Sequence, residues 1–158
     1  MNTNYAGFWL RFVAYLIDGI IIGAVQAIAI MPFLAVFGIG VAGNMDDMES
    51  MSDTQAMSMI GSMMAIGFTA QIVFWCITIL YFSLLESSSK QATVGKMVLG
   101  LKVTDLNGEK LDFVKALVRN LCKIISYLIL CIGYIMAGFT EKKQALHDMI
   151  ASTLVLKK

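Results

Sequence analysis

The sequence predicts an all-α integral membrane protein with two transmembrane helices, a third hydrophobic segment and a small cytoplasmic β-hairpin. Three observations lead to this prediction. First, 58% of the 158 residues are hydrophobic and 15% are charged, whereas soluble domains average about 45–50% and about 25%. Second, the apolar stretches 12–43 and 54–85 both exceed the roughly 20 residues that a spanning helix needs. Third, an alternating segment contains Asn107-Gly108, which is typical of a hairpin turn.

The composition also excludes several classes of protein. A formal net charge of +1 lacks the basic excess of a nucleic-acid-binding protein. Cys76, Cys122 and Cys131 lie in apolar stretches, in an odd number and without metal-ligand spacing, so they indicate neither a disulfide framework nor a metal site. No set of residues supplies a nucleophile with its base. We therefore expect a protein that is not an enzyme and has no cofactor.

We expect the whole chain, 1–158, to form one membrane domain, with a first helix at about 7–37 and a second at about 57–85. Pro32 and a glycine cluster after it indicate the far end of the first helix. The loop 44–55 is acidic, rich in methionine and free of Lys and Arg, whereas 86–119 carries six basic residues. Because basic segments stay in the cytoplasm, we place the amino terminus and residues 86–126 inside and the acidic loop outside.

The third hydrophobic segment, about 120–139, either spans the membrane once or re-enters it. A single span would leave the basic tail, 140–158, outside, against the charge rule. Charged residues recur at helical spacing over 112–126 opposite an apolar face, which is typical of an amphipathic helix in the interface. Residues 101–111 have a hairpin pattern, and 153–156 offers a third strand that joins it only if the tail is cytoplasmic. We therefore favour re-entrance.

The first helix carries a base and an acid on one face. Arg11 and Asp18 are seven residues apart, almost two turns, and Tyr15 and Gln26 extend the same line. Carboxylates within the membrane are unfavourable and usually face protein or water. Either Arg11 and Asp18 pair as a structural feature, or Asp18 binds protons or cations. A matching polar line on the second helix, which would complete a polar pathway, comprises Gln71, Thr78 and Glu86.

Three separated segments resemble the RDD family of bacterial membrane proteins. They are GFWLRFVAYLID at 7–18, ATVGKMVLGLKV at 92–103 and QALHDMIAST at 144–153. The family is named for one arginine and two aspartates, which correspond to Arg11, Asp18 and Asp148, and Arg119 also fits its pattern. The resemblance implies a multi-pass protein of the bacterial inner membrane. Transport is suspected in this family, and cation/proton antiport has been attributed to some of its members.

The second family aspartate follows the only histidine in the chain, His147. One interpretation makes His147 a proton relay, because histidine titrates near neutral pH. The other pairs Asp148 with Arg11 or Arg119 and so holds the tail against the helices. We favour the second interpretation, and a network with both roles stays open.

Three functions are consistent with these features. The first is a transporter-like protein that exchanges a monovalent cation such as Na+ for protons through the charged residues; because two or three spans make a thin pathway, it requires a homo-oligomer. The second is a non-catalytic membrane scaffold or assembly partner. The third is copper handling by Met45, Met48 and Met51, whose thioethers suit Cu(I), although methionine also fills irregular gaps and we favour that reading.

Overall fold

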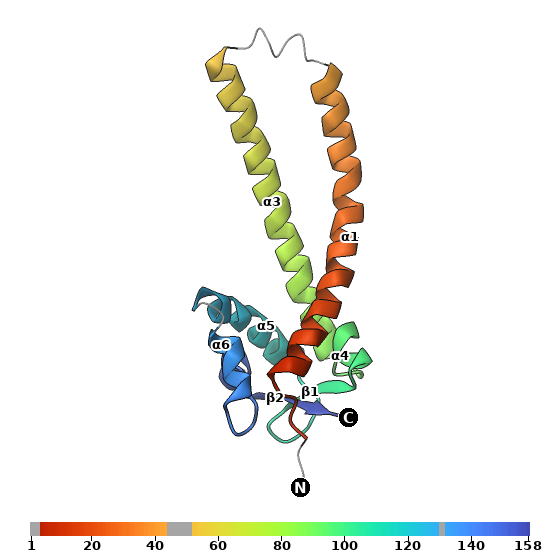
Figure 1. The fold of residues 1–158 in the computed structure, drawn as a ribbon, viewed down its shortest axis with the longest axis vertical. Coiled ribbons are helices and arrows are strands. Elements are labelled where there is room, and N and C mark those ends of the chain that lie inside the picture. The colour runs from red at the N-terminus through yellow and green to blue at the C-terminus, as the bar shows by residue number, and fades with distance from the viewer. Residues whose placement is uncertain (1–3, 44–51, 130–131) are drawn as a thin grey trace. The chain divides into compact units, whose positions relative to one another are not determined.

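The computed structural model describes residues 4–43, 52–129 and 132–158, and these are mostly helical (Figure 1). The chain divides into two compact units. Unit 1 combines Met1–Ile20 with Thr78–Lys158, and unit 2 is Ile21–Ile77. The segments that resemble the RDD family therefore all belong to unit 1.

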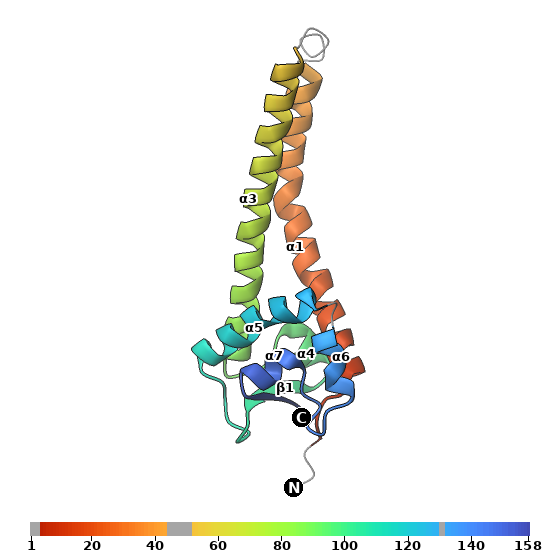
Figure 2. The same cartoon turned by 90° about the vertical axis from the view of Figure 1, so that its left-hand side faces the viewer.

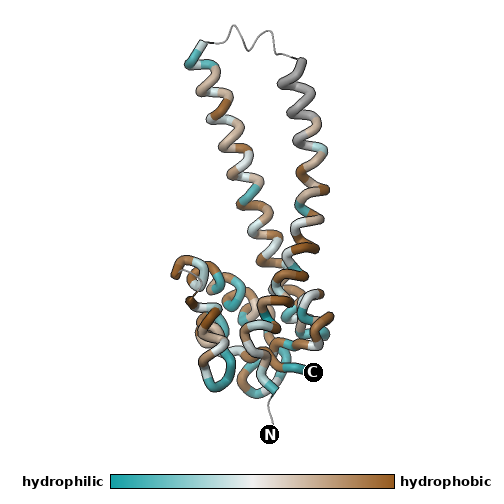
Figure 3. Tube along the Cα trace, viewed as in Figure 1, coloured by the Kyte–Doolittle hydropathy of each residue, from teal (hydrophilic) through white to brown (hydrophobic). Residues whose placement is uncertain are grey.

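Two long helices have the properties of membrane spans. α1 covers Phe8–Gly43 and α3 covers Asp53–Glu86. Their apolar parts, Phe8–Pro32 and the whole of α3, contain 25 and 34 residues, and each includes an 18-residue stretch whose mean hydropathy is 2.1 or 2.0, respectively. Figure 3 shows hydrophobic residues along both tubes. Because an α-helix pairs its own backbone groups, it is compatible with lipid. The prediction of two helices able to span a membrane is confirmed. The predicted end of the first helix is wrong, because α1 continues past Pro32 and position 37 to Gly43.

The third hydrophobic segment is broken. α5 (Phe113–Leu128) contains the first part of the segment together with the amphipathic stretch before it, and α6 (Ile132–Ile135) and the 3-10 turn η1 (Met136–Gly138) contain the last part. The parts before and after the break meet at 118°. Asp112 begins α5 by accepting a hydrogen bond from the backbone N–H of Val114 at 3.1 Å. The segment is therefore not one straight helix.

α5 turns its polar face inward and its apolar face outward. Arg119 and Asn120 are buried, whereas Leu121 and Leu128 are 44% and 78% exposed. A helix of a soluble protein would show the reverse pattern, and an outward apolar face is typical of a helix that contacts lipid in the interface. Figure 2 shows α5 crosswise to the unit 1 part of α3, with α7 (Leu146–Ile150) nearby.

A two-stranded antiparallel sheet joins parts of unit 1 that are far apart in the chain. β1 (Leu101–Asp105) pairs with β2 (Thr153–Lys157), with Val103 opposite Val155. Tyr5 adds an isolated bridge to β2. The predicted strand in the tail is confirmed. Because β1 precedes the third hydrophobic segment and β2 follows it, the two ends of that segment return to the same sheet.

The predicted local hairpin at 101–111 is wrong. Asn107-Gly108 does form a turn, in which Gly108 has a φ of +85° and the Asp105 carboxylate accepts a hydrogen bond from the backbone N–H of Asn107 at 2.9 Å. The chain then leaves the sheet. β1 pairs instead with β2, whose Val155 is fully buried, whereas the first two residues after the turn are exposed. Burial against the core therefore outweighs the local turn signal.

The apolar core of unit 1 lies where the start of α1, the sheet and α5 meet. The short helix α4 (Val94–Val98) leads into β1. Because α1 and α5 both contribute to this core, the core also positions the charged residues of these two helices. Its buried residues are Ala6, Ala14, Leu101, Val103, Leu111, Ala116 and Val155.

Candidate functional site: a buried charge cluster

Arg119 lies at the centre of a buried cluster of charged side chains in unit 1. It comes from α5 and is 2% exposed. Its Nη1 donates to Glu86 Oε2 at 2.7 Å, and its Nε donates to Asp148 Oδ1 at 2.8 Å. Glu86 ends α3 and Asp148 lies in α7. One guanidinium, whose planar donors suit carboxylates, therefore joins three helices.

Arg11 of α1 makes a second ion pair with the same aspartate. Its Nη1 contacts Asp148 Oδ2, and its Nε donates to the carbonyl oxygen of Ala6 at 2.9 Å. Asp148 Oδ2 also accepts the backbone N–H of Ala145, at 3.2 Å, where α7 begins. Burial alone would raise the pKa of Asp148, but the charges of Arg119 and Arg11 outweigh burial and hold this pKa below its usual range. The structure thus brings Asp148 to both arginines.

Glu86 is surrounded by donors that the sequence did not indicate. Its Oε1 pairs with Lys96 Nζ, and its Oε2 accepts Asn120 Nδ2 at 3.1 Å in addition to Arg119. Asn120 Nδ2 also lies 3.3 Å from Ser83 Oγ. Burial lowers the pKa of Lys96, and the neighbouring carboxylate opposes this shift. Lys96 lies inside the family segment 92–103, and Asn120 directly follows Arg119. The family motifs therefore indicated which part of the chain is near the site, but not that these two residues contact Glu86.

Asp18 is fully buried but contacts neither arginine. Its Oδ2 accepts Thr93 Oγ1 at 2.5 Å, and its Oδ1 accepts the backbone N–H of Gly95 at 2.7 Å and the Tyr81 hydroxyl at 3.3 Å. Thr93 occupies the N-cap position of α4, yet the carboxylate of Asp18 takes the helix N–H in its place. Arg11 and Asp18 therefore do not form the direct pair that one interpretation required.

The contact between Asp18 and α4 depends on glycine at position 95. A Cβ built on Gly95 would lie 2.1 Å from the carbonyl oxygen of Ala14 and 3.0 Å from Asp18 Cγ. No real Cβ atom approaches a backbone oxygen so closely. Glycine therefore allows α4 to lie directly against α1.

His147 is buried between Asp148 and aromatic or polar neighbours. Its Nδ1 lies 3.3 Å from Ser126 Oγ, its Nε2 lies 3.5 Å from Asp148 Oδ1, and its ring centroid lies 5.1 Å from that of Tyr134. Burial lowers the pKa of His147 to about 3, and the charge of Asp148 opposes this shift only in part. The imidazole is therefore uncharged at neutral pH.

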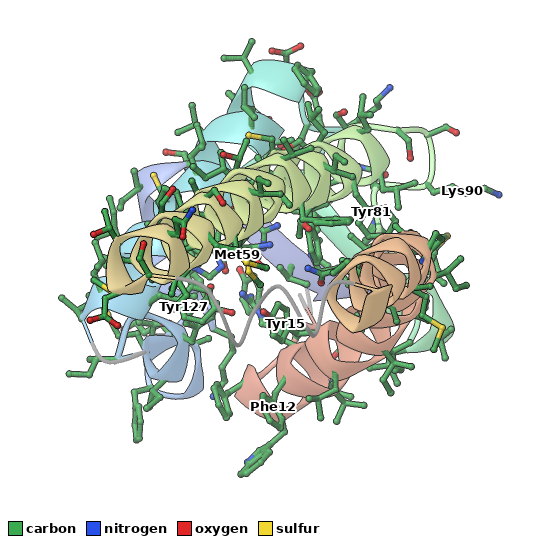
Figure 4. All side chains as sticks on the ribbon, turned by 90° about the horizontal axis from the view of Figure 1, so that it is seen from above. Phe12, Tyr15, Met59, Tyr81, Lys90 and Tyr127 are labelled. Carbon is green, nitrogen blue, oxygen red and sulfur yellow. The ribbon has the colours of Figure 1, made fainter. Side chains whose placement is uncertain are left out.

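A cavity of about 290 Å³ opens beside the cluster within unit 1. Its walls are largely aromatic and aliphatic, and Asp18 also lines it. Tyr15 of α1 and Tyr127 of α5 line it as well; their hydroxyl oxygens are 2.5 Å apart, and Figure 4 shows both side chains from above. Four cationic side chains line the cavity: Arg11, Lys96, Arg119 and Lys123.

The remaining residues named from the sequence lie elsewhere. Thr78 belongs to unit 1 and is half-buried, whereas Gln26 and Gln71 belong to unit 2, where Gln71 is exposed. In the described part of the chain, no group of three or more His, Cys, Asp or Glu side chains could hold a metal ion. The copper candidates lie outside the described residues: Met45, Met48 and Met51.

Two helices of spanning length together with a buried charge cluster define an integral membrane protein. The model of the RDD family matches residues 5–152, which is nearly the whole chain. The chain therefore belongs to the RDD family, and the resemblance seen in its motifs is confirmed.

Two relatives from Bacillus subtilis (strain 168) cover most of the chain. "Uncharacterized protein YxaI" is 38% identical over 156 residues, 97% of each chain. "Uncharacterized membrane protein YteJ" is 31% identical over 159 residues, covering 99% of this chain and 83% of YteJ. "Uncharacterized protein RP437" of Rickettsia prowazekii (strain Madrid E) is 37% identical over 68 residues, covering 43% of this chain and 38% of RP437. No solved structure matches the chain.

Proposed function

We propose that this RDD protein is a non-catalytic membrane scaffold, in which buried charges hold a basic polar module, residues 87–158, against the parts of α1 and α3 that belong to unit 1. One observation carries the proposal: Asp18, Glu86 and Asp148 each accept or pair with three donors inside the protein. Buried carboxylates are stable when they are paired and hydrogen-bonded. Acids that are satisfied in this way leave little room for a passing ion, and they join α1, α3, α4, α5 and α7.

We place unit 1 on the cytoplasmic side of a bacterial inner membrane. All 12 Lys and Arg residues belong to unit 1, and Ile21–Ile77 contains none. Basic segments are retained in the cytoplasm. The pairing of β1 with β2 supports a re-entrant third segment, with the amino terminus and the tail on the same side.

Exchange of Na+ for protons through Asp18 is the competing function. A cation would have to displace the backbone N–H of Gly95, whose position is fixed by α4. It would also approach a cavity that is lined by the guanidinium groups of Arg11 and Arg119, and like charges repel strongly where water is scarce. The geometry therefore favours the scaffold.

Ion flux distinguishes these two functions. The purified protein is reconstituted into liposomes with a Na+ gradient and an internal pH-sensitive dye. The scaffold predicts no proton flux above that of protein-free liposomes. Sodium-dependent flux that is abolished by Asp18→Asn, but not by the same change at the exposed Asp53, would overturn the scaffold.

Cysteine labelling tests the holding role directly. Val155 of β2 is fully buried, so Val155→Cys, in a background without the native cysteines, should react slowly with a maleimide. Arg119→Met removes the group that joins Glu86 to Asp148 and should increase the labelling rate by about tenfold or more, because the module opens more often. Lys115→Met also replaces a basic residue of α5 with methionine, but at an exposed position, and should leave the rate unchanged. An unchanged rate in Arg119→Met would contradict the proposal.

A further inference from the structure

The cavity beside the charge cluster has an apolar wall that the scaffold role does not use. Phe8 and Phe12 of α1 and Phe82 of α3 line its space of about 290 Å³. Concave, mostly apolar sites with a few placed polar groups are typical of small-molecule binding. The cavity is near the lower limit of such sites, so it fits part of a ligand that extends beyond it.

Two basic groups at the cavity have donor capacity that the protein does not fill: Arg11, which pairs with Asp148 through Nη1 alone, and Lys123. The Nη2 of Arg11 is buried and has no hydrogen-bond partner among the described residues. Lys123 Nζ donates to Asn120 Oδ1 at 2.6 Å and lies 4.2 Å from the ring centroid of Phe82. Across the described residues, no carboxylate lies within ion-pair distance of Lys123. A buried donor without an acceptor is unfavourable, so Arg11 Nη2 favours an acceptor in the cavity. Lys123 has an amide acceptor but no carboxylate beside it, so an anion in the cavity would also stabilise its ammonium form.

The cavity and its cluster also contain more basic groups than acids. The four basic side chains that line the cavity face three carboxylates, Asp18, Glu86 and Asp148. Burial keeps the neighbouring His147 uncharged at neutral pH. Burial lowers the pKa of Lys123 to about 7, and a bound anion would favour its charged form and so add the fourth positive charge. An anionic group next to an apolar chain, as in an anionic amphiphile, therefore suits this cavity.

The cavity lies at the ends of the two spanning helices that belong to unit 1. Phe8 and Phe12 stand near the start of α1, and Phe82 stands in the last turns of α3. Such helix ends lie near the headgroups of a bilayer, where tyrosine is enriched. Tyr15 and Tyr127, which are 44% and 49% exposed, line the same cavity. Anionic phospholipids are thus the abundant anionic amphiphiles at this position.

We propose that the cavity binds the phosphate headgroup of an anionic phospholipid, with Arg11 and Lys123 contacting the phosphate and the first part of an acyl chain lying along the phenylalanines. Charge-assisted hydrogen bonds from guanidinium and ammonium groups to phosphate are strong. Free phosphate would leave the aromatic wall uncovered. A phospholipid without net charge would bring its own cation to the site and so favour the charged form of Lys123 less.

Binding to the purified full-length protein in detergent micelles, measured by native mass spectrometry, tests this proposal with three probes. These are phosphatidylglycerol, phosphatidylcholine and inorganic phosphate. We expect phosphatidylglycerol to bind about tenfold more tightly than either of the others. Equal binding of the two phospholipids would overturn the proposal. Inorganic phosphate that binds as tightly as phosphatidylglycerol would identify an anion site that gains nothing from an acyl chain, and would also overturn it.

Substitution of Lys123 tests the site itself. Lys123→Met removes the charge, keeps a side chain of similar length against Phe82, and should weaken phosphatidylglycerol binding about tenfold. Lys123→Arg should retain the preference, and Lys115→Met at an exposed position of α5 should leave it unchanged. Equal losses in Lys123→Met and Lys115→Met would assign binding to the general positive field and reject the cavity. Circular dichroism checks that the variants fold, and the three probes decide the proposal on the wild-type protein alone if a variant does not fold.

Discussion

Alanine at position 95 tests the close contact between α4 and α1. The added Cβ of Gly95→Ala would lie 2.1 Å from the carbonyl oxygen of Ala14, a backbone atom that moves only with α1. Overpacking of this kind destabilises by about 1–3 kcal/mol. A shift of α4 would also weaken the hydrogen bond from the backbone of residue 95 to the carboxylate of Asp18, worth about 1.5–3 kcal/mol for a charged acceptor. Since alanine favours a helix by about 0.5–1 kcal/mol over glycine, we expect a net loss of about 3 kcal/mol.

Gly19→Ala is the matched control for this experiment. Gly19 also lies inside a helix, next to Asp18, but a Cβ there meets no atom within 4 Å. It should be neutral or stabilise by about 0.5–1 kcal/mol. Unfolding by SDS in mixed micelles, followed by tryptophan fluorescence, gives the free energies of both variants. A Gly95→Ala variant as stable as the wild type, or equal changes in the two variants, would refute the argument that this contact requires glycine.

Three further predictions concern the charge cluster and use the same unfolding assay. Arg119→Met should lower the free energy of unfolding by about 3–5 kcal/mol, because it leaves two buried carboxylates each short of a cation. Arg11→Met should lower it less, since Asp148 keeps its pair with Arg119. The opposite order would contradict the central position of Arg119. Thr93→Val removes the hydroxyl donor of a buried carboxylate and should cost about 1.5–3 kcal/mol, whereas Thr93→Ser keeps the donor, so equal losses would indicate packing instead. Lowering the pH from 7 to 5 should reduce the free energy of unfolding by about 2 kcal/mol. The pKa of His147 falls from 6.5 to about 3 on folding, so its imidazole takes up a proton in this range only in the unfolded state. His147→Gln should flatten this pH dependence, and a slope that survives would belong to another group.

The long helices and the inward-facing charges could be predicted from the sequence. Uninterrupted apolar stretches leave a chain few alternatives in lipid, and Arg11 and Asp18, almost two turns apart, necessarily share a face of one helix. Their partners could not be predicted in the same way. Asp18 takes Thr93 and Gly95 because α4 approaches α1 where no side chain intervenes, and that approach is a property of three-dimensional packing. Spacing within one helix carries no information about it.

The sheet shows the same limit more clearly. Asn107-Gly108 is a strong local signal, and it does produce a turn, but it does not decide which strand pairs with β1. That choice depends on Val155, which is far along the chain and fully buried against the core. Local turn chemistry competes here with non-local burial, and burial decides the pairing.

The order of synthesis gives the pairing of β1 with β2 a consequence for assembly. β2 leaves the ribosome long after β1, and until then Leu101 and Val103 have no strand beside them and Tyr5 has no bridge. Both spanning helices are made before the sheet can close. A nascent chain arrested before Thr153 would therefore carry complete membrane helices and an uncovered strand edge, the kind of surface on which chaperones and proteases act.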